Sequence, residues 1–166
     1  MESYLAELLE WYCGERGGEA FFSALARGAR EQNRAAKWEK LAQLENLVGH
    51  RLLTELAARK VPIPSTEADL QRGLHSAQSY VGLTWRQMLD KLRLELVGYV
   101  RSFEDAESRM PEELVALAQF VTDHERALLE FVTRELDQNG HRSLDYVLAM
   151  LGETQGGRAD GVRAQD

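Results

Sequence analysis

Apolar residues recur at alternating three- and four-residue steps through four long segments, which is the pattern of amphipathic helices. The segments cover approximately residues 2–30, 34–59, 84–107 and 111–137. They are rich in Ala, Leu, Glu and Arg, which are strong helix formers. The sequence therefore predicts an all-α protein built as a bundle of four long helices.

Residues that start or stop helices lie at the ends of these segments. Pro62 and Pro64 end the second segment, because proline cannot continue a helix. Thr84 and Gln87 have the spacing of a capping box at the start of the third. Pro111 is followed by two acids and predicts the start of the fourth helix.

A long connection, residues 61–83, separates the second and third helices. Residues 65–70 within it have the pattern of a capped helix start, so we expect one short helix there. A connection of this length lets the chain cross from one end of the bundle to the other, as in ferritin-like folds. The second and third helices need not be hairpin neighbours.

The last part of the chain predicts a short fifth helix over residues 143–151, with Ser143 as its N-cap. Its apolar side would dock on the bundle or on another subunit. We expect one helical domain over residues 1–152 and a disordered tail over residues 153–166, because the tail has little to bury.

A glutamate interrupts each of the four apolar stripes near its centre. Burying a carboxylate in a packed core is costly, so each glutamate needs a metal ion, a cation or a shared proton as its partner. Glu15 also lies on the first stripe, one turn before the central residue. The four central glutamates are Glu19, Glu45, Glu95 and Glu125.

Four amphipathic helices with central glutamates are how a carboxylate-bridged dimetal centre is built in a bundle. Residues 38–45, WEKLAQLE, have the aromatic-acid-x-Leu-Ala-x-x-Glu pattern of the ferritin-like superfamily, particularly its rubrerythrin branch, which the chain resembles over about residues 3–138. The resemblance implies a ferritin-like fold with a crossover, an iron or manganese cofactor, and oxygen or peroxide chemistry. It implies terminal ligands at Glu19 and Glu95 and bridging ligands at Glu45 and Glu125.

The chain departs from the family at two expected histidine ligands. The family has Glu-x-x-His on its second and fourth helices, and here Val48 and Leu128 occupy the histidine positions. His50 and His124 lie at other angles around their helices, where partly solvated or capping roles are expected. The resemblance therefore implies a carboxylate-only site, which would bind metal weakly and support at most marginal redox chemistry.

A second interpretation needs no metal. The glutamates can pair with arginine or lysine, share protons or face a water-filled cavity. The protein would then be an interaction or structural module whose exposed apolar surface forms a homodimer. The residues leave both interpretations open.

Two residue types suggest local departures from regular packing. Gly14, Gly17 and Gly18 weaken the first helix, so we expect a kink or a close backbone approach there. Tyr12 and Tyr99 lie on the apolar stripes and are expected to fill the core.

Composition excludes several other classes. The net charge of −7 and the absence of a Lys/Arg cluster disfavour nucleic-acid binding. The single cysteine, Cys13, excludes an internal disulfide and a Cys-based zinc site. No apolar stretch is long enough for a membrane span, and the start lacks a signal-peptide pattern, so we expect a cytoplasmic protein without membrane contact.

Overall fold

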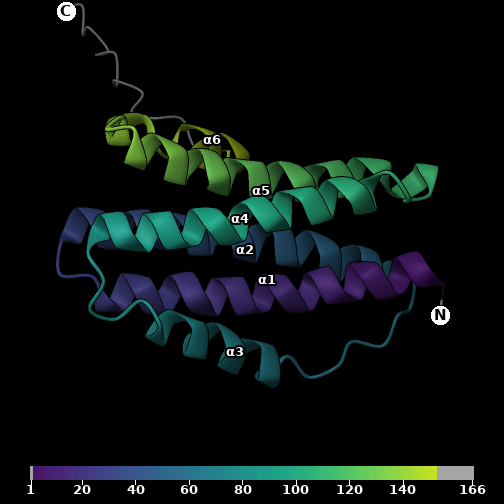
Figure 1. The fold of residues 1–166 in the computed structure, drawn as a ribbon. Coiled ribbons are helices and arrows are strands. Elements are labelled where there is room, and N and C mark those ends of the chain that lie inside the picture. The colour runs from purple at the N-terminus through teal and green to yellow at the C-terminus, as the bar shows by residue number, and fades with distance from the viewer. Residues whose placement is uncertain (1, 153–166) are drawn as a thin grey trace, which may run out of the picture.

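The computed structural model describes residues 2–152 (Figure 1). Every regular element in this part of the chain is helical, which confirms the all-α prediction. The expected disordered tail, residues 153–166, lies outside the described residues. The helices are α1 (Ser3–Gly28), α2 (Gln32–Ala58), α3 (Glu67–Gln78), α4 (Trp85–Glu107), α5 (Val115–Leu136) and α6 (Asp145–Met150), with 3₁₀ turns at Glu112–Leu114 and Gly140–Arg142.

The four long helices form two pairs, α1 with α2 and α4 with α5 (Figure 1). After α2 the chain returns along α1 through α3, so α2 and α4 run in the same direction. Helix α3 is the short helix that the sequence predicted in the connection, and it packs on α1. No helix within residues 2–152 is long and apolar enough to cross a membrane.

The helix ends confirm one capping prediction and correct another. Thr84 and Gln87 form a complete capping box at the start of α4. Ser143 does not cap α6, because α6 begins two residues later with Leu144 at its N-cap position. The Ser143 hydroxyl instead donates to Glu135 at 2.6 Å, and Lys37 forms an ion pair with the same carboxylate. Glu135 thus connects the segment that precedes α6 to α2.

Aromatic side chains fill one half of the core. Trp38 of α2 is 1% exposed and lies at the centre of this group. Its ring lies 5.8 Å from Phe22 of α1, 5.0 Å from Trp85 of α4 and 5.8 Å from Phe131 of α5. Such ring pairs add to the free energy gained by burying the rings. One side chain therefore joins all four long helices.

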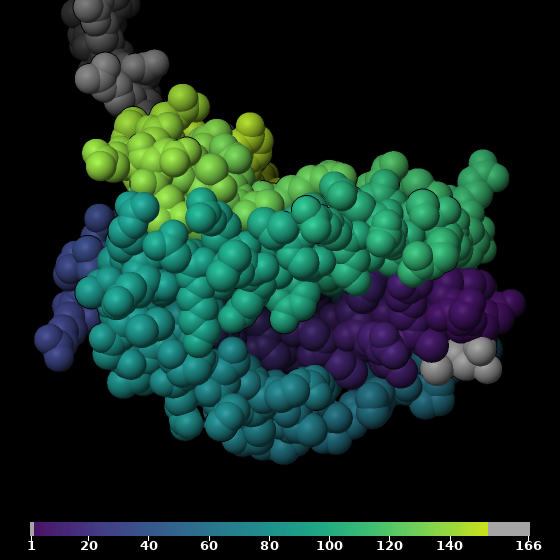
Figure 2. Space-filling model, in the orientation of Figure 1, coloured from purple at the N-terminus to yellow at the C-terminus, as the bar shows by residue number. Residues whose placement is uncertain are grey.

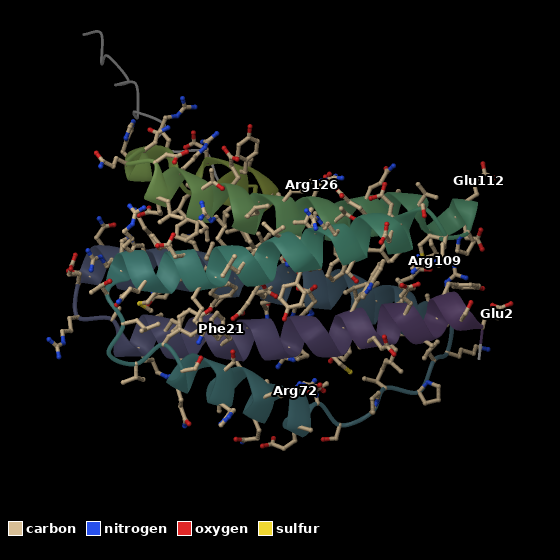
Figure 3. All side chains as sticks on the ribbon, in the orientation of Figure 1. Glu2, Phe21, Arg72, Arg109, Glu112 and Arg126 are labelled. Atoms are coloured by element: carbon tan, nitrogen blue, oxygen red, sulfur yellow. The ribbon has the colours of Figure 1, made fainter. Side chains whose placement is uncertain are left out.

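Ion pairs on the surface also connect the helices. Arg126 of α5 pairs with Glu104 of α4 at 2.8 Å, and Arg109 pairs with Glu7 of α1 at 3.2 Å (Figure 3). Exposed pairs of this kind contribute little to stability. The buried contacts determine the arrangement of the helices.

Backbone contact between two glycines joins α3 to α1. A Cβ atom on Gly73 would lie 2.1 Å from the carbonyl oxygen of Gly17, and a Cβ on Gly17 would lie 3.1 Å from the carbonyl oxygen of Asp69. The glycines in the first helix therefore permit a close backbone approach, as the sequence suggested. Because of this contact, α3 lies close against α1.

We expect Gly73→Ala to destabilise the protein by about 1–3 kcal/mol, because the added methyl group meets rigid backbone. Urea unfolding measures the change in the free energy of unfolding. Gly98→Ala in α4 is the matched control. A Cβ there meets nothing within 4 Å, so this variant should match or exceed wild-type stability. Equal stability of the two variants would contradict a close backbone contact between Gly73 of α3 and Gly17 of α1.

Candidate metal centre

Three buried polar side chains from three helices meet in the middle of the bundle. Glu15 comes from α1, Glu45 from α2 and His124 from α5, and they are 3%, 5% and 0% exposed. The Nε2 atom of His124 lies 3.3 Å from Oε2 of Glu15 and 3.5 Å from Oε1 of Glu45. One ligand atom from each residue lies within 4.8 Å of the other two. We call these three residues the central triad.

The apolar stripes bring the triad together. Glu45 lies between Leu41 and Val48, both 0% exposed, so its carboxylate must enter the core. Gly18 of the facing helix α1 makes room for the carboxylate of Glu45, because a Cβ there would lie 2.3 Å from Oε2 of Glu45. A Cβ on Gly49 would lie 3.5 Å from the Cβ of Glu15, which is an ordinary van der Waals contact.

The imidazole of His124 is held by its own helix. Its Nδ1 atom lies 2.8 Å from the carbonyl oxygen of Val121. A carbonyl only accepts hydrogen bonds, so Nδ1 carries a hydrogen and Nε2 faces the carboxylates. Nε2 can then offer a lone pair to a metal ion or, when protonated, a hydrogen to Glu15 or Glu45. Fixing one ring nitrogen in this way is how proteins orient metal-binding histidines.

Burial and mutual charge displace the pKa values of these groups. Burial raises the pKa of Glu15 well above its usual value, and Glu45 raises it further against the opposing effect of His124. Burial alone would lower the pKa of His124, but the neighbouring carboxylates, Glu15 first, raise it well above its usual value. Both residues therefore tend to keep a proton when no other cation is present.

The triad fits a metal ion. Nε2 of His124 and Oε2 of Glu15 are buried without a hydrogen-bond partner. Ligand atoms held about 2.0–2.2 Å from one ion in tetrahedral geometry lie about 3.4 Å apart. The 3.3 and 3.5 Å separations from His124 Nε2 match that spacing, and the ligand atoms of the two carboxylates lie within 4.8 Å of each other.

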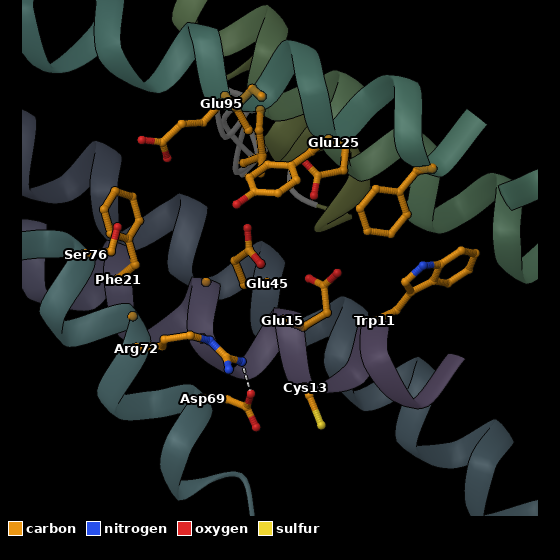
Figure 4. Close-up of a pocket in the computed structure, with 18 of the residues that line it drawn as sticks. Trp11, Cys13, Glu15, Phe21, Glu45, Asp69, Arg72, Ser76, Glu95 and Glu125 are labelled. Carbon is orange, nitrogen blue, oxygen red and sulfur yellow. Dashed lines mark hydrogen bonds and ion pairs between the residues drawn. The ribbon is translucent and has the colours of Figure 1, made fainter. Parts of the chain in front are cut away.

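Two other expected ligands lie near the triad. Glu95 and Glu125 line the same cavity as Glu15 and Glu45, and the carboxylates of Glu15, Glu45 and Glu125 point into one space (Figure 4). Glu125 is 8% exposed and its Oε2 atom has no hydrogen-bond partner. Burial raises its pKa to about 7, against the opposing effect of His124. Glu95 accepts a hydrogen bond from Tyr80 at 3.3 Å.

Glu19, the fourth expected ligand, lies apart from the triad. It forms an ion pair with Arg16 and accepts a hydrogen bond from Asn46 at 3.1 Å. Its side chain is 28% exposed. Glu15, one turn earlier on the same stripe, is the α1 residue that joins the triad. The apolar stripe alone could not separate the two, because residues four positions apart share a helix face.

His124 is the functional candidate that the sequence pattern missed. The pattern assigned it to a partly solvated flank, and this was wrong because it is fully buried. The physical reason is that α5 contacts α4, α2 and α6, so more than one face of it is covered. His50, in contrast, is exposed.

Comparisons with protein-family models, curated proteins and solved structures found no match. The fold and the triad define the class of protein: a helical bundle with a buried cluster of two carboxylates and one histidine.

We expect Glu125→Gln to stabilise the metal-free protein more at pH 8 than at pH 5. A pKa raised to about 7 means that Glu125 contributes stability below its unfolded-state pKa, and that this contribution is lost as the pH rises through 7. The stability gain should grow by about 1–3 kcal/mol between the two pH values.

Urea unfolding in the presence of a chelator measures this difference, with the exposed Glu39→Gln as control. The control should change stability equally at both pH values. A gain from Glu125→Gln that is the same at pH 5 and pH 8 would contradict the assignment of Glu125 as a buried acid.

Proposed function

We propose that the protein binds a divalent transition-metal ion, iron or manganese, at Glu15, Glu45 and His124 inside a ferritin-like bundle. One observation carries the proposal. The potential ligand atoms of these three residues converge in the core, and two of them, Glu15 Oε2 and His124 Nε2, have no hydrogen-bond partner. A protonated His124 can pair with these carboxylates, but one imidazolium faces two buried acids. A divalent cation held by all three residues would neutralise both carboxylates.

The ligand types favour a transition metal. Imidazole suits iron and other transition metals, whereas sites made only of oxygen ligands suit magnesium and calcium. Three protein ligands also leave coordination positions open, as in catalytic rather than structural metal sites. This site differs from the carboxylate-only site implied by the resemblance, because His124 supplies a nitrogen ligand.

The ferritin-like assignment rests on topology and on the glutamates. The two helix pairs, the parallel α2 and α4 and the connection along α1 support it (Figure 1). So does a glutamate from each long helix beside the same cavity: Glu15, Glu45, Glu95 and Glu125. The departure is that the histidine directly precedes Glu125, instead of following it by three positions.

The chemistry that iron or manganese supplies in an open site of this kind is reduction of oxygen or peroxide. The chain itself would hold the ion and manage protons. Glu125, with a pKa of about 7, can keep or release a proton beside the triad near neutral pH. Trp11 and Leu128 line the same cavity and add apolar surface to it.

We expect about one Mn²⁺ or Fe²⁺ per chain and a higher melting temperature when either ion is added anaerobically. A ligand at 100 times its Kd stabilises a protein by about 2.7 kcal/mol. Glu45→Gln and His124→Ala should each abolish the effect, because each removes a ligand. Elemental analysis and thermal unfolding measure the two quantities.

Glu19→Gln is the matched control, because Glu19 lies outside the triad on the same helix as Glu15. It should bind metal like the wild type. Loss of metal in Glu19→Gln with retention in Glu15→Gln would reverse the assignment. A wild-type protein that binds no metal, and that Glu45→Leu stabilises, would support the metal-free interaction module.

Gly18→Ala should weaken metal binding while the protein stays folded. Its methyl group would overlap Oε2 of Glu45, the end of a flexible side chain that can move away. We expect a loss of affinity of about tenfold or more, as when a group that orients a metal ligand is removed. Titration of the metal-free protein with Mn²⁺ measures it. Gly28→Ala on the same helix is the control, because a Cβ there meets nothing within 4 Å. Equal affinities would show that Glu45 does not depend on Gly18.

A further inference from the structure

A cavity of about 560 Å³ extends from the triad to the surface between α3 and α4. Figure 2 shows atoms of α1 at the bottom of the gap that separates these two helices. A volume of this size is typical of sites that bind small organic molecules. It is much larger than a metal ion or an oxygen molecule needs.

Glycines of α1 form part of the floor. Gly14, Gly17 and Gly18 all line the cavity. A Cβ on Gly14 would meet nothing within 4 Å, so this position opens onto free space. The absence of side chains here leaves the backbone accessible to a ligand.

Part of the cavity wall is apolar. Aromatic and aliphatic side chains line the cavity on both sides of the floor and would bind the apolar body of a ligand. They are Trp11, Phe21, Leu92, Leu96 and Phe103.

The charges in the cavity favour a cation. Arg72 is the one basic residue among the lining residues, and Asp69 already pairs with it (Figure 4). A divalent ion at the triad would balance Glu15 and Glu45. Neither Glu95 nor Glu125 forms an ion pair with a described lysine or arginine, and the imidazole of His124, which acts on the pKa of Glu125, would be occupied by the metal ion. An anionic ligand would be repelled.

Tyr99 lines the cavity together with Glu95 and Glu125. It is 53% exposed, so the expectation that it fills the core was wrong. Burial of the rest of its side chain raises its pKa, and nearby Glu95 and Glu125 raise it further. The half-exposed ring of Tyr99 belongs to the open side of the cavity. An aromatic face beside carboxylates is a common receptor for organic cations.

We propose that the cavity binds a primary amine with an apolar body, whose ammonium group lies between Glu95 and Glu125 against the ring of Tyr99. The apolar body lies on the glycine floor between α3 and α4. Glu125 contributes the independent evidence of a ligand, because it lines the cavity and its buried Oε2 atom has no hydrogen-bond partner. This inference goes beyond the metal site and does not require it.

The test is calorimetric titration of the full chain with three matched probes: 4-phenylbutylamine, 4-phenylbutan-1-ol and 4-phenylbutanoate. Each is measured with Mn²⁺-loaded and with chelator-treated protein. The amine should bind about tenfold more tightly than the alcohol, since the ammonium gains charge and cation–π contacts, and the carboxylate should not bind. Metal content is measured separately. A protein that binds no metal would therefore contradict only the metal site, and a protein that binds no amine would contradict only the amine site.

Two variants test the location. Glu95→Gln should reduce amine affinity about tenfold and leave the affinity for the alcohol unchanged. Gly14→Leu should remove binding of both amine and alcohol, because it fills the floor, while metal content and melting temperature stay at wild-type values. Carboxylate binding equal to amine binding, or full amine affinity in both variants, would overturn the proposal. If Gly14→Leu does not fold, Glu95→Gln decides alone.

Discussion

The structure depends on how carboxylates are accommodated in the centre of an apolar bundle. Glu15 and Glu45 are almost completely buried, and leaving such charges unpaired would cost more than most single contacts contribute. His124 compensates for this cost because its Nε2 atom faces both carboxylates. A leucine at position 124 would leave the two acids facing only each other. The balance of charge in the core therefore depends on one imidazole, which α5 brings to the carboxylates of α1 and α2.

Helix α1 packs closely against both α2 and α3. Gly17 brings α3 into backbone contact, and Gly18 makes room for the carboxylate of Glu45. Because the two glycines are adjacent in sequence, they lie on different faces of α1 within the same helical turn. Glycine lowers the intrinsic stability of the helix, and the contacts that it permits offset this cost. The same glycines leave part of the α1 backbone open to the cavity.

The sequence predicted the long helices, the capping box at Thr84 and the short helix in the connection, because these depend on local patterns of apolar and capping residues. The apolar pattern also predicted that Glu45 and Glu125 face the core, and both are buried. It selected Glu19 instead of Glu15 on the first helix, because the two share a face. The contacts of Glu19 with Arg16 and with Asn46 of α2 distinguish them, and the apolar pattern does not show these contacts. The sequence pattern also could not predict that His124 is buried. Its burial follows from the contacts of α5 with three other helices, which a single stripe does not describe.

A proton and a metal ion compete for the same atoms of the triad. The bond from His124 Nδ1 to Val121 leaves Nε2 in one orientation, whether it carries a hydrogen or a lone pair. Protons on Glu15 or His124 therefore stabilise the cluster with the geometry that a metal ion would use. Glu95 and Glu125 are not members of the triad but line the same cavity. Glu125 still senses the triad, because His124 opposes the rise of its pKa. The acids of this bundle thus include an inner pair that favours a small cation and two further acids beside the larger cavity, where we propose that an organic cation binds.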